Sequence, residues 1–188
     1  MRVITGKARG MKLRSLEGTE IIRPTADAVK ESMFSIVQFD IDEDTVVLDL
    51  FAGSGQLGIE ALSRGAKKAY FVDSSRDSIA VIKENLAHTK LEEQAQVVNM
   101  PNSAFLRTAR EKIDIAFLDP PYGKDLIQRS LPALTGIMSG NGIIVCEHEK
   151  ECRLPEEVNG FVISGKYRYG KIALTVYKRK ESEETETE

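Results

Sequence analysis

The residues best suited to chemistry in this chain are Asp119-Pro120-Pro121-Tyr122, which directly follow the apolar run 113–118. Such a run predicts a buried strand, and open α/β sheets bind ligands beyond the carboxyl ends of their strands. A turn that merely ends a strand would explain the prolines, but not the flanking carboxylate and aromatic ring. The four residues together suit the binding of a planar ring through its exocyclic amine, and we predict that all four are catalytic.

A second pattern, Gly53-x-Gly55-x-x-Gly58, follows the apolar run 46–50 and leads into a stretch with helical periodicity. Glycines at these places let the backbone turn tightly beneath a ligand and let the helix pack close to the strand. Asp73 ends the next apolar run, where a carboxylate can accept hydrogen bonds from ribose hydroxyls. The pattern therefore predicts a ligand that contains adenosine, which is true of both NAD and S-adenosylmethionine.

Two acids favour S-adenosylmethionine over NAD. Asp49 ends the strand that leads into the glycine loop, and Asp119 ends the strand that precedes the two prolines. Carboxylates there would repel the pyrophosphate of NAD, whereas they suit the sulfonium and ammonium groups of S-adenosylmethionine. The residues predicted to bind this cofactor are Asp49, Phe51, Ala52, Gly53, Ser54, Gly55, Asp73, Ser74, Asn102 and Asp119.

The net charge of −3 hides an uneven distribution of charge along the 188 residues. Five glutamates lie between 181 and 188, which predicts a disordered, solvated tail. Residues 1–14 hold five Lys or Arg and no acid, which favours a surface that contacts nucleic-acid phosphates. An ordinary solvated hairpin face is the alternative. The predicted RNA-binding residues are Arg2, Lys7, Arg9, Lys12, Arg14 and Arg23.

The remaining composition predicts a reduced, cytoplasmic enzyme without a metal. Cys146 and Cys152 do not match the spacing of zinc or redox sites, and His88 and His148 have no partners at metal-ligand spacing. No apolar stretch reaches the length that crosses a membrane, and the N-terminus lacks the apolar segment of a signal peptide. We expect no membrane partner and a monomer.

The pattern of elements predicts an α/β fold. Predicted strands at 46–51, 68–72, 95–99, 113–118 and 142–147 alternate with predicted helices at 56–64, 76–87, 103–110 and 125–135. This alternation predicts a parallel sheet covered on both faces.

The two ends of the chain differ from this pattern. Residues 2–13 predict a small basic β-hairpin, and Thr25 is a plausible N-cap of a helix that runs to Val37. Residues 161–167 and 172–177 predict an antiparallel hairpin. The expected organisation is an N-terminal extension at 1–22, a Rossmann-like domain at 23–180 and a tail at 181–188.

Taken together, these motifs resemble the RsmD family of 16S rRNA (guanine-N2)-methyltransferases. The likeness includes the N-terminal hairpin pattern, Arg23-Pro24-Thr25, the loop 51–65 and the motif 119–122. The resemblance implies a class I methyltransferase fold and transfer of a methyl group from S-adenosylmethionine to the exocyclic N2 of one guanine. It also implies that the substrate is 16S rRNA, naked or within a partly assembled small subunit. A base paired in a helix could not enter such a site, so the guanine must be unpaired or flipped out.

One position departs from the family pattern. An Asp or Asn followed by Ala is usual after the strand 95–99, and Pro101-Asn102 stands there instead. Either Asn102 contacts the adenine through a one-residue shift, or that contact is weakened. Other substrates for the Asp-Pro-Pro-Tyr motif are adenine N6 in DNA or RNA and a glutamine side chain. An NAD-dependent oxidoreductase and a nucleotide-sensing module without catalysis are alternatives from other classes.

Overall fold

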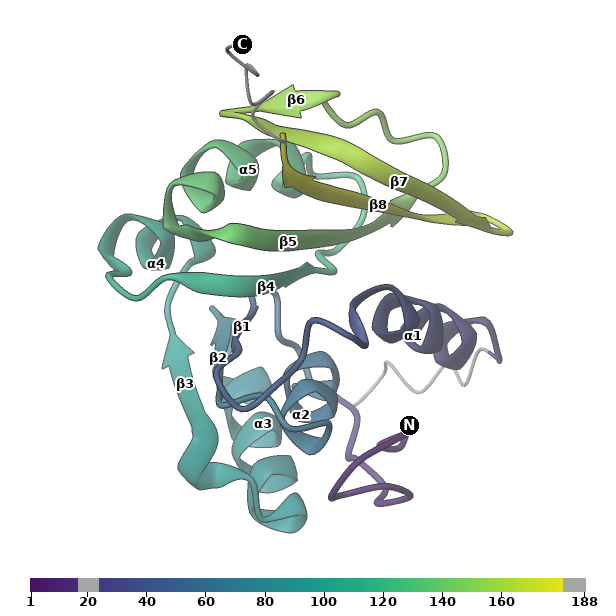
Figure 1. The fold of residues 1–188 in the computed structure, drawn as a ribbon. Coiled ribbons are helices and arrows are strands. Elements are labelled where there is room, and N and C mark those ends of the chain that lie inside the picture. Colours follow the sequence, from purple (N-terminus) through teal and green to yellow (C-terminus); the bar gives the residue numbers. More distant parts are fainter. Residues whose placement is uncertain (17–23, 181–188) are drawn as a thin grey trace, which may run out of the picture.

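The computed structural model describes residues 1–16 and 24–180, so the predicted tail and Arg23 lie outside the described residues (Figure 1). Strands and helices alternate through the middle of the chain, as expected. The helices are α1 (Pro24–Val37), α2 (Gln56–Ser63), α3 (Arg76–Thr89), α4 (Asn102–Thr108) and α5 (Leu126–Ile137). The strands are β1 (Val46–Asp49), β2 (Lys68–Asp73), β3 (Ala95–Asn99), β4 (Ile113–Leu118), β5 (Met138–Glu149), β6 (Glu157–Val158), β7 (Phe161–Tyr169) and β8 (Ile172–Arg179).

All the strands belong to one eight-stranded sheet with the order β3-β2-β1-β4-β5-β8-β7-β6. Strands β1 to β5 are parallel, whereas β8 is antiparallel and lies between β5 and β7. This arrangement confirms the predicted Rossmann-like fold with an antiparallel C-terminal hairpin. The winding of the sheet reverses between β1 and β4, and ligands bind beyond the carboxyl ends of the strands at such a reversal.

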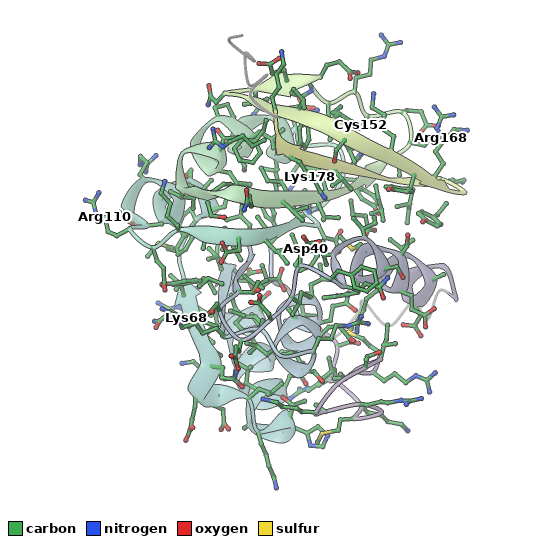
Figure 2. The ribbon with its side chains drawn as sticks, viewed as in Figure 1. Asp40, Lys68, Arg110, Cys152, Arg168 and Lys178 are labelled. Carbon is green, nitrogen blue, oxygen red and sulfur yellow. The ribbon has the colours of Figure 1, made fainter. Side chains whose placement is uncertain are left out.

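Helices cover both faces of the sheet. Successive side chains of a strand point to opposite faces, so Val47 of β1 packs with α1, α2 and α3, whereas Val46 and Leu48 pack with α4 and α5. Figure 1 shows the two sets of helices on opposite sides of the sheet, and Figure 2 shows the side chains that fill the space between. Burial on both faces explains why these strands read as continuous apolar runs.

The N-terminal hairpin is present, but it contains no regular strand. One β-bridge joins Arg2 to Lys12, and the backbone N–H of Val3 donates to the carbonyl oxygen of Met11 at 3.0 Å. Glycines take up the left-handed backbone at the turn, with φ of 88° at Gly6. The hairpin is therefore held mainly by what it packs against.

That packing is against α2. The backbone N–H of Lys7 donates to the carbonyl oxygen of Ser63 at 2.8 Å, and a Cβ at Gly6 would lie 1.8 Å from the same oxygen. Val3 and Leu13 of the hairpin are buried in the core shared with α1, α2 and α3. Residues 1–13 thus complete one face of the domain.

Most predicted element ends are displaced by no more than two residues, and two further differences concern the starts of α1 and β5. Helix α1 begins at Pro24, so Thr25 is inside the helix instead of being its N-cap; the fixed φ of proline suits the first helical position. Strand β5 begins at Met138, which pairs with Ile113 of β4. The strand was predicted to begin at residue 142. The register shifts after the Met138 pair, so residues 139–142 form an irregularity before Ile143 pairs with Ile115.

Candidate active site

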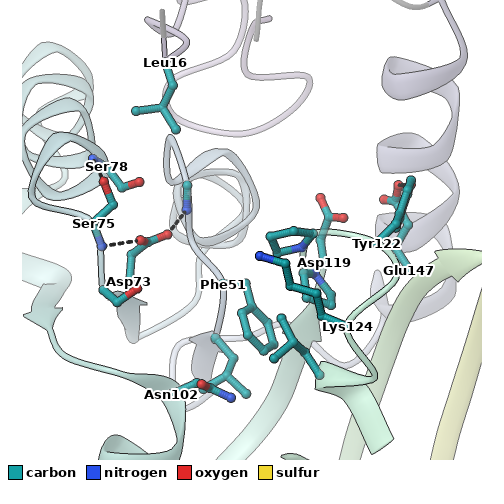
Figure 3. Close-up of a pocket in the computed structure, with 16 residues that line it drawn as sticks. Leu16, Phe51, Asp73, Ser75, Ser78, Asn102, Asp119, Tyr122, Lys124 and Glu147 are labelled. Carbon is teal, nitrogen blue, oxygen red and sulfur yellow. Dashed lines mark hydrogen bonds between the residues drawn. The ribbon is translucent and has the colours of Figure 1, made fainter. Parts of the chain in front are cut away.

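A cavity of about 950 Å³ opens at the carboxyl ends of the central strands (Figure 3). It lies where the sheet reverses between β1 and β4, as the topology predicts. The residues that line it are Leu16, Leu50, Phe51, Gly53, Asp73, Ser74, Ser75, Ser78, Asn102, Asp119, Pro120, Pro121, Tyr122, Lys124, Leu126 and Glu147.

Asp73, at the end of β2, fixes the glycine loop on one side of the cavity. One of its carboxylate oxygens, Oδ2, accepts a hydrogen bond from the N–H of Gly53 at 2.9 Å, and Oδ1 accepts one from the N–H of Ser75 at 2.8 Å. A Cβ at Gly58 would lie 2.3 Å from a ring carbon of Phe71, so glycine there lets α2 pack against β2. Each carboxylate oxygen can accept a further hydrogen bond, so Asp73 can also bind a ligand in the cavity.

The Asp-Pro-Pro-Tyr motif forms the opposite side of the cavity. Asp119 directly follows β4, and its side chain points into the cavity (Figure 3). Tyr122 is 42% exposed, and its hydroxyl donates a hydrogen bond to Oε1 of Glu147 at 3.0 Å. The motif therefore presents a carboxylate and an accessible aromatic ring to the same space.

Asp49 is buried, Asp119 and Glu147 are half-buried, and none of the three has a cationic partner among the described residues. Burial raises the pKa of Asp49 to about 7, against the hydrogen bond at 3.0 Å from the N–H of Gly58. Burial is also the main cause that raises the pKa of Asp119 well above its usual value, with added repulsion from Glu147 and Asp49. Burial raises the pKa of Glu147 as well. Among the described residues, no ion pair involves these acids, so the region favours a cationic ligand.

The structure brings most of the predicted site residues together. All four predicted catalytic residues line the cavity, as do six of the predicted cofactor residues, Phe51, Gly53, Asp73, Ser74, Asn102 and Asp119. The other four, Asp49, Ala52, Ser54 and Gly55, are buried and do not line the cavity. Ala52 donates its N–H to the carbonyl oxygen of Val72 at 3.1 Å, and the Ser54 carbonyl oxygen accepts from Asn85 Nδ2 at 2.9 Å. These residues support the loop from beneath.

Seven lining residues were not predicted from the sequence, namely Leu16, Leu50, Ser75, Ser78, Lys124, Leu126 and Glu147. The position of Glu147 in the sequence could have predicted it, because it directly follows the apolar run 142–146, just as Asp119 follows 113–118. Asn102 lies at the start of α4, and its amide nitrogen donates to Oγ of Ser130 at 2.8 Å.

The basic N-terminal residues are exposed on a segment that leads to the cavity. Arg2, Lys7, Arg9, Lys12 and Arg14 are all exposed, and Leu16 lines the cavity. Arg14 forms an ion pair with Glu84 at 2.5 Å.

The two cysteines and His148 lie away from the cavity lining. Cys146 and Cys152 are free thiols, and the buried His148 contacts Oγ1 of Thr175 through Nε2 at 2.8 Å. Among the described residues, no three potential metal ligands cluster, and no helix is long and apolar enough to cross a membrane.

The sheet order, with β8 inserted antiparallel beside β5, and a ligand cavity between the glycine loop and the β4 motif define a class I methyltransferase fold. Residues 1–178 match the model of a family described as "Conserved hypothetical protein 95", and the chain belongs to that family. This membership confirms the resemblance to the RsmD proteins.

Similar proteins cover nearly the whole chain. YlbH of Bacillus subtilis is 39% identical over 185 residues, which cover 96% of this chain and 100% of YlbH. "Ribosomal RNA small subunit methyltransferase D" of Haemophilus influenzae is 38% identical over 156 residues, 80% of each chain. The solved structure of yhhF from Escherichia coli superimposes with a TM-score of 0.83 and 32% identity, and the match covers 97% of this chain and 99% of yhhF.

Proposed function

We propose that this chain transfers a methyl group from S-adenosylmethionine to the exocyclic N2 of a guanine in small-subunit ribosomal RNA. The observation that carries the proposal is the pairing of Asp73 and Asp119 across one cavity, with the glycine loop on one side and Asp-Pro-Pro-Tyr on the other. The name of the Haemophilus influenzae relative supports the substrate class. We place the reaction in the cytoplasm, where ribosomal subunits are assembled.

The cavity residues fit the functional groups of S-adenosylmethionine, which supplies an electrophilic methyl group when bound. Asp73 would accept hydrogen bonds from the ribose hydroxyls. The amide nitrogen of Asn102 donates a hydrogen bond to Oγ of Ser130, and its amide oxygen would accept one from the adenine amine. The buried acids, whose pKa values are raised by desolvation, would be stabilised in their charged form by a sulfonium and an ammonium group.

Asp119 and the carbonyl oxygen of Pro120 would hold the target amine. The lone pair of guanine N2 is delocalised into the ring, which makes the nitrogen a poor nucleophile. Two acceptors that receive hydrogen bonds from its two N–H groups would bend the nitrogen towards tetrahedral geometry and localise the lone pair. Tyr122 would stack on the base, an interaction worth about 1–3 kcal/mol, and most of the acceleration would come from alignment of the two reactants.

The basic hairpin would contact the RNA backbone. Lys7, Arg9 and Lys12 are exposed and take part in no ion pair between described residues. Exposed cations attract nucleic-acid phosphates, and the counterions released on contact favour binding. This surface favours a nucleic acid over a protein substrate.

Methylation mapping tests the proposal. The purified protein is incubated with unmethylated small-subunit rRNA, either naked or in a partly assembled subunit, and with S-adenosylmethionine that carries a labelled methyl group. We expect N2-methylguanine at a single position and no product with Asp119→Ala. Label on adenine, or no transfer to either form of the RNA, would contradict the proposal, and binding of NADH instead of S-adenosylmethionine would favour an oxidoreductase.

A further inference from the structure

Glu147 is a cavity residue that the mechanism above does not use. Strands β4 and β5 are parallel neighbours, with Leu118 paired to Cys146. The next residue along each strand is an acid. Asp119 directly follows β4, and Glu147, still within β5, stands at the same level of the sheet. Adjacent strands lie about 4.8 Å apart, and Figure 3 shows both carboxylates pointing in the same direction. The cavity therefore holds two acceptors side by side.

One carboxylate oxygen of Glu147 is engaged and the other is available. Oε1 accepts the hydrogen bond from the Tyr122 hydroxyl at 3.0 Å, and no hydrogen bond or ion pair with another described residue involves Oε2. The bond from Tyr122 favours the ionised carboxylate and opposes the burial that raises its pKa. Tyr122 thus fixes Glu147 beside the place where the base would stack.

This arrangement matches the hydrogen-bonding edge of guanine. Guanine carries two adjacent donors, N1–H and the N2 amine, whereas adenine carries an acceptor at N1 next to its N6 amine. We propose that Oε2 of Glu147 accepts the N1–H of the target guanine while Asp119 and Pro120 hold its N2 amine. Glu147 would then be the residue that selects guanine, because the lone pair of adenine N1 would face a carboxylate. The inference rests on the proposed function and names its specificity determinant.

A change on the hydrogen-bonding edge of the target base, combined with variants of Glu147, separates this role from general support of the site. Two RNA fragments are compared, with guanine or 2-aminopurine at the methylated position found by mapping. 2-Aminopurine keeps the N2 amine, but it has an acceptor at N1 in place of the donor and lacks O6. The contribution of N1 is therefore taken from the change in preference between the unaltered protein and the Glu147 variants. The unaltered protein is expected to favour guanine by about tenfold or more in kcat/KM, the size of one charge-assisted hydrogen bond.

The variant Glu147→Gln should remove most of this preference. Glutamine has nearly the same shape as glutamate, but its amide can donate to N1 of 2-aminopurine, so the guanine preference should fall by about tenfold or more. Glu149→Gln is the matched control, because Glu149 is exposed on the same strand and does not line the cavity; it should keep the preference of the unaltered protein. Glu147→Asp retains the charge and should keep the preference with a lower kcat/KM.

Each outcome decides between the alternatives. A preference in Glu147→Gln equal to that of the unaltered protein would overturn the assignment of Glu147, even with guanine methylation intact. A loss of preference in Glu147→Asp equal to that in Glu147→Gln would also overturn it, because a carboxylate would then not be the determinant. If the unaltered protein methylates neither RNA, the proposed function itself fails, and the inference fails with it.

Discussion

Two groups of buried acids in this molecule differ in how their charge is balanced. Glu60 of α2 is fully buried, yet its carboxylate contacts the ammonium of Lys30 at 3.1 Å and Nε of Arg64 at 2.9 Å. It also accepts hydrogen bonds from the backbone N–H groups of Ile4 at 2.8 Å and Thr5 at 3.0 Å. The second group, called the cavity acids below, consists of Asp119 and Glu147 in the cavity lining and Asp49 beneath it. These acids have no ion-pair partner among the described residues.

The difference separates charge that holds the fold from charge that is kept for a ligand. A buried carboxylate is tolerated when opposite charges and donors surround it, and it is costly when they do not. Burial lowers the pKa of Lys30 while Glu60 raises it, so each member of that pair supports the charge of the other. The cavity acids instead carry raised pKa values, which a cationic ligand would lower.

The largest effect is expected from Glu60→Ala. The change leaves Lys30 charged and buried and leaves the N–H groups of Ile4 and Thr5 without their acceptor, so unfolding free energy should fall by about 3–5 kcal/mol. Urea denaturation measures it. The double variant Glu60→Ala/Lys30→Ala should lose less than the two single variants together. A loss below about 1 kcal/mol for Glu60→Ala would remove the contrast between the two groups.

Asp119→Ala should have the opposite profile. Because desolvation already penalises this carboxylate, its removal should not lower the free energy of unfolding. Methyl transfer should fall by at least about 100-fold, because the amine loses the acceptor that orients it. Single-turnover transfer at saturating cofactor gives the rate, and denaturation of the same preparation gives the stability. A variant that unfolds more easily than the unaltered protein would place Asp119 with Glu60 instead.

Asp49→Asn should change how stability depends on pH. The Asp49 pKa is about 7 in the folded protein, above its usual 3.8, so the folded state holds a proton that the unfolded state has released. Stability from this group is complete below pH 3.8 and is lost as the pH rises towards 7. Between about pH 5 and about pH 8, the free energy of unfolding of the unaltered protein should fall by about 2–3 kcal/mol because of this group. The variant should not show this fall. Thermal unfolding of both proteins at the two pH values measures this difference. An equal change in stability with pH in the unaltered protein and in Asp49→Asn would contradict the prediction.

Asp73→Ala should weaken S-adenosylmethionine binding by about tenfold or more, through loss of charge-assisted bonds to the ribose. The carboxylate also holds Gly53 and Ser75, so Asp73→Asn, which retains an acceptor oxygen, should lose less. Calorimetry gives the affinities, and RNA binding should barely change. Equal cofactor affinity in all three proteins would remove Asp73 from the ligand-binding group.

The smallest effect per residue is expected on the outer surface of the hairpin that Glu60 anchors. Replacement of Lys7, Arg9 and Lys12 by Ala should weaken RNA binding and flatten its salt dependence by about 0.7–0.9 of a log–log unit for each lost phosphate contact. Stability should stay unchanged, because these side chains are exposed. Filter-binding titrations at several salt concentrations measure the slope. If the slope of the triple variant equals that of the unaltered protein, the three side chains form an ordinary solvated face.

Much of the fold and of the cavity follows from local sequence signals. The apolar runs predicted the five parallel strands, and the acids and glycines beside them predicted the cavity. The burial of Glu60 was not predicted, because its partners Ile4 and Lys30 are far from it in sequence. Within α2 alone, Glu60 resembles an ordinary exposed helix residue. Asp49 was predicted to bind the cofactor, but it is buried and accepts a hydrogen bond from the N–H of Gly58. The turn of the loop that buries it depends on packing against β2, which local sequence does not specify.

The hairpin contacts also set an order of events during translation. Ile4 and Arg14 bond to Glu60 and Asn85, which follow them by 56 and 71 residues. At about 5–20 residues per second, this interval is on the order of several seconds. The core in which Val3 and Leu13 are buried is complete only after α2 and α3 have been made. Residues 1–14 are therefore made early and folded late, and a nascent chain that ends before α3 carries them as an unfolded, positively charged segment.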